Sequence, residues 1–136
     1  MKALIFAISL LGFALPLAAS GSTDQPRLYF VEPADGQTVP REFRVVFGLA
    51  GMGVAPAGVD RDNTGHHHLL IDVEQLPDLT QPLPANDNIR HFGGGQTETV
   101  LTLPPGKHTL QLLMGNHMHI PHQPPVISDR ITVIVE

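Results

Sequence analysis

The chain has 136 residues and no cysteine, and its 13 acidic and 8 basic residues give a formal net charge of −5 when histidine is neutral. A chain of this length forms one small domain, which cannot use disulfides and must build any metal site from histidine, methionine, carboxylate or backbone ligands. The negative charge argues against nucleic acid or an anionic membrane as a partner, because both are bound through basic surfaces.

Residues 1–20 have the pattern of a secretory signal peptide. The start is basic, residues 3–15 are almost wholly apolar, Pro16 breaks the run, and residues 18–20 are small enough for a signal peptidase. The apolar run is too short to span a bilayer, and no later segment reaches the roughly 18 apolar residues that a spanning helix needs. We therefore expect an exported protein, periplasmic or secreted, with a single domain over residues 21–136 and no membrane insertion.

The rest of the chain has the pattern of strands separated by turns, with little that is typical of a helix. Strands are expected, in chain order, at 27–31, 43–49, 66–73, 98–103, 107–114 and 126–135. Stretches rich in glycine and proline separate them, including Pro33-Ala-Asp-Gly36 and Pro104-Pro105-Gly106. Residues 74–97 contain three prolines and a triple glycine, so we expect them to be mostly irregular, with at most one short edge strand.

Six or seven short strands in a domain of this size predict an immunoglobulin-like antiparallel β-sandwich of about seven strands, with a small barrel as the alternative. One histidine fits a recurrent feature of that fold. His108 follows the turn glycine Gly106 by two residues, a place where such sandwiches commonly carry a tyrosine that bonds back to the backbone. We therefore expect His108 to have a structural role.

Seven of the eight histidines fall in segments that this topology gathers at one end of the sandwich. His66–His68 open the third strand, His91 precedes the fourth, and His117, His119 and His122 lie in the loop before the last strand. Three separate segments thus supply imidazoles to one small region, which predicts a shared site.

The alternation of side chains along a strand divides the three consecutive histidines. His66 and His68 share one face, a spacing that can chelate one ion, whereas His67 shares the opposite face with Leu69 and Ile71. We expect His67 to pack at the rim of the core and to donate a hydrogen bond there.

Imidazole ligands suit copper, zinc and nickel, and thioethers nearby favour reduced copper. Met114 and Met118 lie close in sequence to the last histidines, although single methionines usually serve packing. The prediction is a bound metal ion, with copper a better fit than zinc. The expected ligands are His66, His68, His91, His119 and His122.

Two other classes of function remain open at this point. An enzyme is not indicated, because the chain has neither a Gly-x-Ser-x-Gly element nor a His-Glu-x-x-His motif, yet a metal hydrolase or oxidase would need only an open position on the ion. The rival to a metal carrier, buffer or sensor is a non-enzymatic binding or accessory domain of the cell envelope with structural histidines. The sequence identifies no protein partner.

Four motifs carry a resemblance to a known family. They are Asn63-Thr-Gly-His-His-His-Leu-Leu-Ile-Asp72, Phe92-Gly-Gly-Gly-Gln-Thr-Glu98, Pro105-Gly-Lys-His-Thr-Leu-Gln111 and His119-Ile-Pro-His-Gln-Pro-Pro-Val126. Together they resemble the motif set of the bacterial family named domain of unknown function 4399, which implies an exported all-β domain without an established activity. The family pattern includes His66, His67, His68, His91, His108, His119 and His122, while His117 falls at a variable place.

The opening Pro33-Ala-Asp-Gly36, followed by a strand, is also similar to periplasmic copper-resistance sandwiches. Those proteins bind copper partly through a histidine at the mature N-terminus. Cleavage of this chain would expose Gly21 or Ser20 instead, so their site is not carried over.

Overall fold

The computed structural model describes residues 25–136, and the expected signal peptide lies outside them. The strands, in chain order, are β1 (Arg27–Glu32), β2 (Thr38–Val39), β3 (Glu42–Ala50), β4 (Gly53–Val54), β5 (Thr64–Ile71), β6 (Ile89–His91), β7 (Glu98–Thr102), β8 (Gly106–Gly115) and β9 (Ile131–Val135). This part of the chain contains no helix, and therefore no helix that could cross a membrane.

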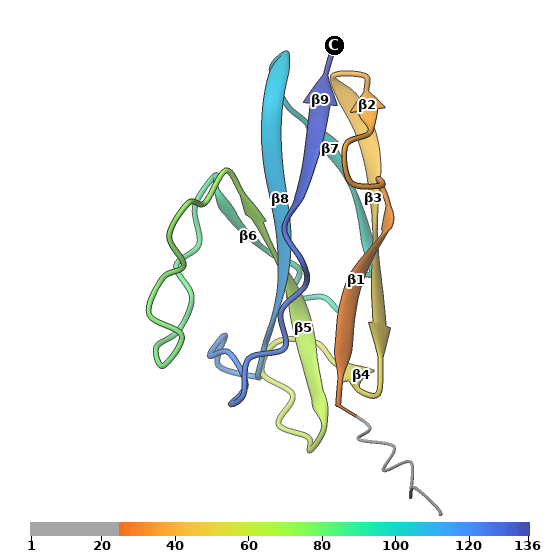
Figure 1. Ribbon diagram of the computed structural model, residues 1–136. Coiled ribbons are helices and arrows are strands. Elements are labelled where there is room, and N and C mark those ends of the chain that lie inside the picture. The colour runs from red at the N-terminus through yellow and green to blue at the C-terminus, as the bar shows by residue number, and fades with distance from the viewer. Residues whose placement is uncertain (1–24) are drawn as a thin grey trace, which may run out of the picture.

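The strands form two sheets that pack face to face (Figure 1). One sheet has the order β1-β3-β7 and is antiparallel, and the other has the order β2-β9-β8-β5-β4, with β6 added beside β5. Only the two-residue strands β2 and β4 pair in parallel, with β9 and β5 respectively. This arrangement confirms the predicted immunoglobulin-like sandwich.

The last expected strand is shorter than predicted at its N-terminal end, because β9 begins at Ile131. An isolated bridge still joins Leu113 to Ile127, but it is one residue out of step with the β8–β9 register. At the shift, the Leu112 N–H donates a hydrogen bond to the Ser128 hydroxyl oxygen at 2.9 Å. A bulge of this kind interrupts an otherwise continuous ladder.

The main core lies between the two sheets and consists of the inward-facing residues of both. It includes Leu28, Phe43, Val45, Phe47, Leu69, Leu101, Leu110, Leu112, Met114 and Val133. Burial of each large apolar side chain contributes about 1.5–3 kcal/mol, so this layer supplies most of the hydrophobic stabilisation.

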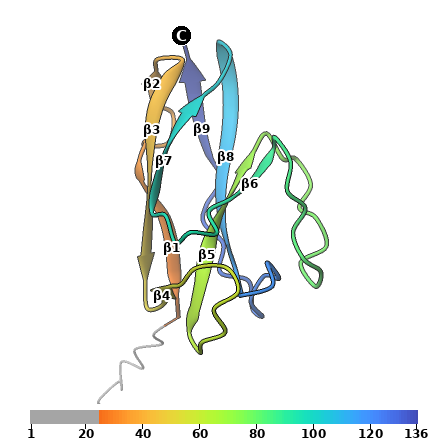
Figure 2. The same ribbon diagram turned by 180° about the vertical axis from the view of Figure 1, so that it is seen from behind.

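A smaller core lies on the outer face of β5 and β8, and the sequence pattern did not predict it. Its buried members are Leu70, Leu83, Ile89 and Leu113. Leu83 comes from residues 72–88, which follow β5 and lie beyond β6 on the side away from β1 and β3 (Figures 1 and 2). Strand β5 is therefore buried on both faces, which is the setting of the candidate site.

Candidate metal centre

His66 and His68 project from the outer face of β5, beside the smaller core, and both are completely buried. His91 of β6 pairs directly with His68, and Gly115 of β8 pairs with His66. Because paired residues of neighbouring antiparallel strands share a face, His91 joins the two histidines of β5.

His119 reaches the same place from the turn after β8. The Asn116 side chain organises this turn, since its Oδ1 accepts the Met118 and Ile120 N–H groups at 2.9 and 3.1 Å. His119 itself has a left-handed backbone with φ 64°, which costs a non-glycine residue roughly 1–2 kcal/mol. The turn brings the Nδ1 of His119 to 2.9 Å from the Nε2 of His66.

Three ligand nitrogens, one each from His66, His68 and His119, lie within 4.8 Å of one another, close enough to hold one metal ion. His91 packs against this group, with its ring centroid 4.3 Å from that of His68 and 4.7 Å from that of His119. We call these four residues the histidine cluster. Imidazoles from three separate segments are thus brought together, as the sequence predicted.

The His68 ring occupies the space that a side chain at Gly115 would fill. A Cβ atom at this position would lie 2.5 Å from the Cε1 of His68 and 3.1 Å from its Nδ1, so any side chain would displace the ring. Neither Gly115 nor Asn116 was among the predicted site residues. A glycine–asparagine pair is a turn signal, and it indicates the turn without revealing that the turn supports a site.

Several ring nitrogens in the histidine cluster have no hydrogen-bond partner among residues 25–136. They are both nitrogens of His68 and the Nδ1 of His66. An unsatisfied buried polar group costs about 1–3 kcal/mol, and a metal ion bound to these lone pairs would remove part of that cost.

His91 differs from the buried histidines because one of its nitrogens has a protein partner. Its Nε2 lies 3.1 Å from the Pro84 carbonyl, which can only accept a hydrogen bond. The Nε2 therefore carries the proton, and the Nδ1 of the neutral ring keeps its lone pair. A backbone carbonyl fixes the tautomer of many metal-binding histidines in this way.

Burial keeps His66 and His68 uncharged. Together with the neighbouring imidazoles, it lowers the pKa of His66 to about 4 and that of His68 to about 3. The pKa of His119 is lowered as well, first by burial and then by His91. These rings are neutral at pH 7, which is the form in which imidazole binds a metal.

The two remaining histidines of this region lie outside the group of three nitrogens. His122 donates from Nε2 to the Thr64 carbonyl at 3.1 Å, and it is close enough to His66 to contribute to the lowered pKa of that ring. It also lines a groove of about 400 Å³. His117 instead faces Asp60, with 3.3 Å between Nδ1 and Oδ1.

His67 points to the opposite face of β5, as predicted. It is 1 % exposed and packs against Phe47, with ring centroids 5.0 Å apart. Neither ring nitrogen has a partner at full hydrogen-bond geometry within the described residues, and the group nearest to the expected hydrogen bond is the Gln96 backbone. Burial lowers the pKa of His67 to about 4, and the nearby Gln96 backbone opposes this only in part.

The methionines give no support to a thioether ligand in the cluster. Met114 is buried in the core between the sheets, on the other side of β8, and Met52 packs against that core. Met118 is 52 % exposed. The sequence suggested that nearby thioethers favour reduced copper, but the packing places none of these three methionines in the cluster.

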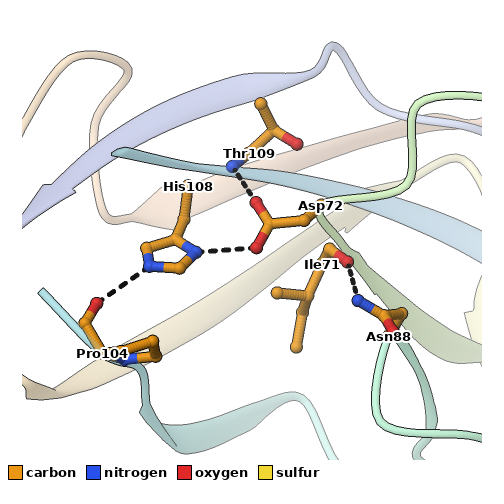
Figure 3. Close-up of polar contacts among 6 residues, drawn as sticks. All are labelled: Ile71, Asp72, Asn88, Pro104, His108 and Thr109. Carbon is orange, nitrogen blue, oxygen red and sulfur yellow. Dashed lines mark hydrogen bonds and ion pairs between the residues drawn. The ribbon is translucent and has the colours of Figure 1, made fainter. Parts of the chain in front are cut away.

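His108 lies at the other end of the β5–β8 pair and confirms the structural role expected for it (Figure 3). Its Nε2 lies 2.8 Å from the Pro104 carbonyl, and its Nδ1 lies 2.7 Å from Oδ2 of Asp72. The other carboxylate oxygen accepts the Thr109 N–H at 2.8 Å. Burial lowers the pKa of His108, but its bonds to Asp72 and Pro104 outweigh burial and raise the pKa overall.

The fold is similar to that of a solved structure, the endo-beta-1,4-mannanase from Thermotoga petrophila, with a TM-score of 0.51 at 16% sequence identity. The match covers 87% of this chain and 21% of that chain, so the protein spans about a fifth of the length of the enzyme. At this identity the likeness concerns the fold alone. No curated protein matches the chain.

A family model described as domain of unknown function (DUF4399) matches residues 45–136. The matched part contains β5 to β9 and every residue of the histidine cluster. The resemblance indicated by the histidine motifs is confirmed, and the chain belongs to the DUF4399 family.

Proposed function

We propose that the protein is an exported metal-binding module, periplasmic or secreted, whose ion is copper and which carries, buffers or senses that ion. One observation carries the proposal: neutral imidazole nitrogens of His66, His68 and His119 converge within 4.8 Å. Export is supported by the signal-peptide pattern of residues 1–20.

Copper fits the donor set better than zinc does. The group of converging donors contains nitrogen only, and copper binds nitrogen ligands more tightly than the other divalent first-row metals. His91 and His122 are proposed as further ligands. In each of them a backbone carbonyl accepts the Nε2 proton, which leaves the Nδ1 lone pair of the neutral ring free to bind.

The rival function is an accessory domain in which the histidines are structural. A structural histidine satisfies its ring nitrogens with hydrogen bonds, as His108 does. Neither nitrogen of the buried His68 forms such a bond at full geometry within residues 25–136, although the Leu113 backbone lies close enough to oppose the lowering of its pKa in part. His67 also lacks such bonds and packs in the core, so the convergence of His68 with His66 and His119 is what favours metal binding over a purely structural role.

Titration of the purified protein with copper and with zinc tests the proposal. We expect one copper ion per chain, and at a free concentration of about 100 times Kd a gain of roughly 2.7 kcal/mol in stability and of roughly 10 °C in Tm. No change in Tm with a large excess of either ion would contradict metal binding and support the accessory-domain function.

Two variants locate the binding. His66→Ala combined with His68→Ala is expected to abolish the Tm shift, and His119→Ala, which changes only the turn, provides a second variant that leaves β5 intact. His117→Ala is the matched control, because its ring faces Asp60 and not the cluster. Binding that survives the loss of His119 and of the β5 pair would place the ion elsewhere.

A further inference from the structure

Among the described residues, the charges that act on the pKa values of His66, His68 and His119 are those of other histidines and not of carboxylates. Among residues 25–136, the donor group that could hold an ion contains three histidines and no carboxylate. The two acidic side chains that face histidines serve other residues, since Asp60 faces His117 and Asp72 faces His108. A bound ion would therefore keep its whole charge in this site.

The cost of burying an ion in an uncharged site depends on its charge. The desolvation penalty grows with the square of the charge, so a divalent ion loses about four times as much hydration energy as a monovalent ion of similar size. His66 and His68 are completely buried, so water is excluded from the ion on the side of β5, whereas the half-buried His91 and His119 lie on the more open side. Neutral nitrogen ligands donate to either ion but offset neither charge.

The geometry of the donors also favours a monovalent ion. The three converging nitrogens come from two neighbouring positions of β5 and from the 116–120 turn, and the His66 and His119 rings meet nearly at right angles, at 87°. Such an arrangement supplies a compact set of three nitrogens. Divalent copper prefers a square-planar or tetragonal set of ligands, so it would also need His91 or His122, whose nitrogens lie outside the group of three. A monovalent ion needs fewer ligands and can be held by the group of three alone.

We infer that the histidine cluster selects monovalent copper over divalent ions, because it offers two buried and one half-buried neutral imidazole and no carboxylate. This inference rests on the proposed function and adds the charge state of the ion.

The test compares silver(I), a monovalent probe that does not change oxidation state, and copper(I) under anaerobic conditions with zinc(II). Each ion is titrated into the purified protein in competition with a chelator of known affinity. We expect one silver(I) or copper(I) ion per chain, bound on the order of 100-fold more tightly than zinc(II). Zinc(II) bound through the same histidines as tightly as silver(I) would overturn the inference.

A charge variant isolates the cause of the selectivity. His91→Glu places a carboxylate against His68 and His119, whose rings contact His91, and His91→Gln is the neutral control. The ratio of zinc(II) to silver(I) affinity should rise at least about tenfold in His91→Glu relative to His91→Gln. An unchanged ratio would overturn the electrostatic explanation.

The outcomes separate this inference from the proposed function. If divalent ions bind through the cluster and monovalent ions do not, metal binding stands and the selectivity is wrong. If none of the three ions changes Tm or competes with the chelator, the proposed function itself fails, and the inference fails with it.

Discussion

The two ends of the β5–β8 pair use the same residue type in opposite ways. At one end His66 and His68 are buried and neutral, and their free nitrogens are available to an ion. At the other end His108 is held between a carboxylate and a carbonyl. Both partners of His108 accept hydrogen bonds, so the doubly protonated ring makes both bonds, and this raises its pKa. The partners of a histidine therefore decide whether it can bind a metal or serve as a structural cation.

The same contrast gives the two ends opposite effects on stability as pH changes. A histidine whose folded pKa is lowered stabilises the fold fully above the unfolded pKa near 6.5, and the contribution is lost as pH falls. A histidine whose folded pKa is raised contributes fully below 6.5, and the contribution is lost as pH rises through the folded pKa. The protein should thus be most stable close to neutral pH.

The largest expected effect is acid destabilisation of the metal-free protein. Below pH 6.5 the unfolded chain takes up protons that His66, His67 and His68 cannot accept when folded, because their folded pKa values are about 4, 4 and 3. A ring that stays neutral when folded loses roughly 2 kcal/mol of stability between pH 6.5 and pH 5, and the full loss of roughly 3 kcal/mol is reached only below the folded pKa of about 4. Urea unfolding between pH 7.5 and pH 5 measures the effect.

The double variant His66→Ala with His68→Ala is the control for acid destabilisation, and its unfolding free energy should fall less steeply over the same pH range. A wild-type stability that stays constant from pH 7.5 to pH 5 would mean that the folded and unfolded states take up equal numbers of protons. The proposed difference between the two ends of the β5–β8 pair would then be wrong.

His108→Ala should have the next largest effect. It removes the hydrogen bonds to Asp72 and Pro104, and we expect a loss of roughly 1–3 kcal/mol in unfolding free energy at pH 6. The loss should shrink as pH rises, because the wild-type ring gives up its second proton. Chemical denaturation at pH 6 and pH 9 measures the loss of unfolding free energy and its dependence on pH.

The variant His108→Tyr separates the hydrogen bond of residue 108 from the charge of its ring. A tyrosine hydroxyl can donate to the backbone upstream, as in the tyrosine corner of related folds, without a charge that titrates near neutral pH. This variant should keep more stability than His108→Ala and lose the alkaline dependence. Copper binding should be unchanged in both variants, and a loss of binding would show that the two ends are coupled.

The smallest expected effect is that of His67→Phe. The ring of His67 packs against Phe47 and forms no hydrogen bond within the described residues, so phenylalanine should match its packing and change stability by less than about 1 kcal/mol at pH 7. Acid sensitivity should decrease, because one histidine with a lowered pKa is removed. Calorimetric titration with copper should still give one ion per chain. Loss of copper binding in this variant would show that His67 is a ligand.

The local pattern of the sequence predicted most of the strands. It also predicted on which face of its strand each histidine of the run His66–His68 lies. A strand alternates its side chains regardless of its neighbours, so the run His66–His68 alone placed its first and last rings on one face and His67 on the other. Turn residues likewise marked most strand limits. The hydrogen bond from His108 to the backbone followed from its position after Gly106, and the structure confirms it.

Only the tertiary structure decided the chemical state of the histidines. Residues 72–88 lack a regular pattern, yet Leu83 packs against Leu70 and Leu113, and this buries the face of β5 that carries the cluster. The break before β9 likewise depends on the contact between Ser128 and Leu112. Burial and the choice of hydrogen-bond partners arise from residues distant in the chain, and a periodic pattern along one strand contains no information about them.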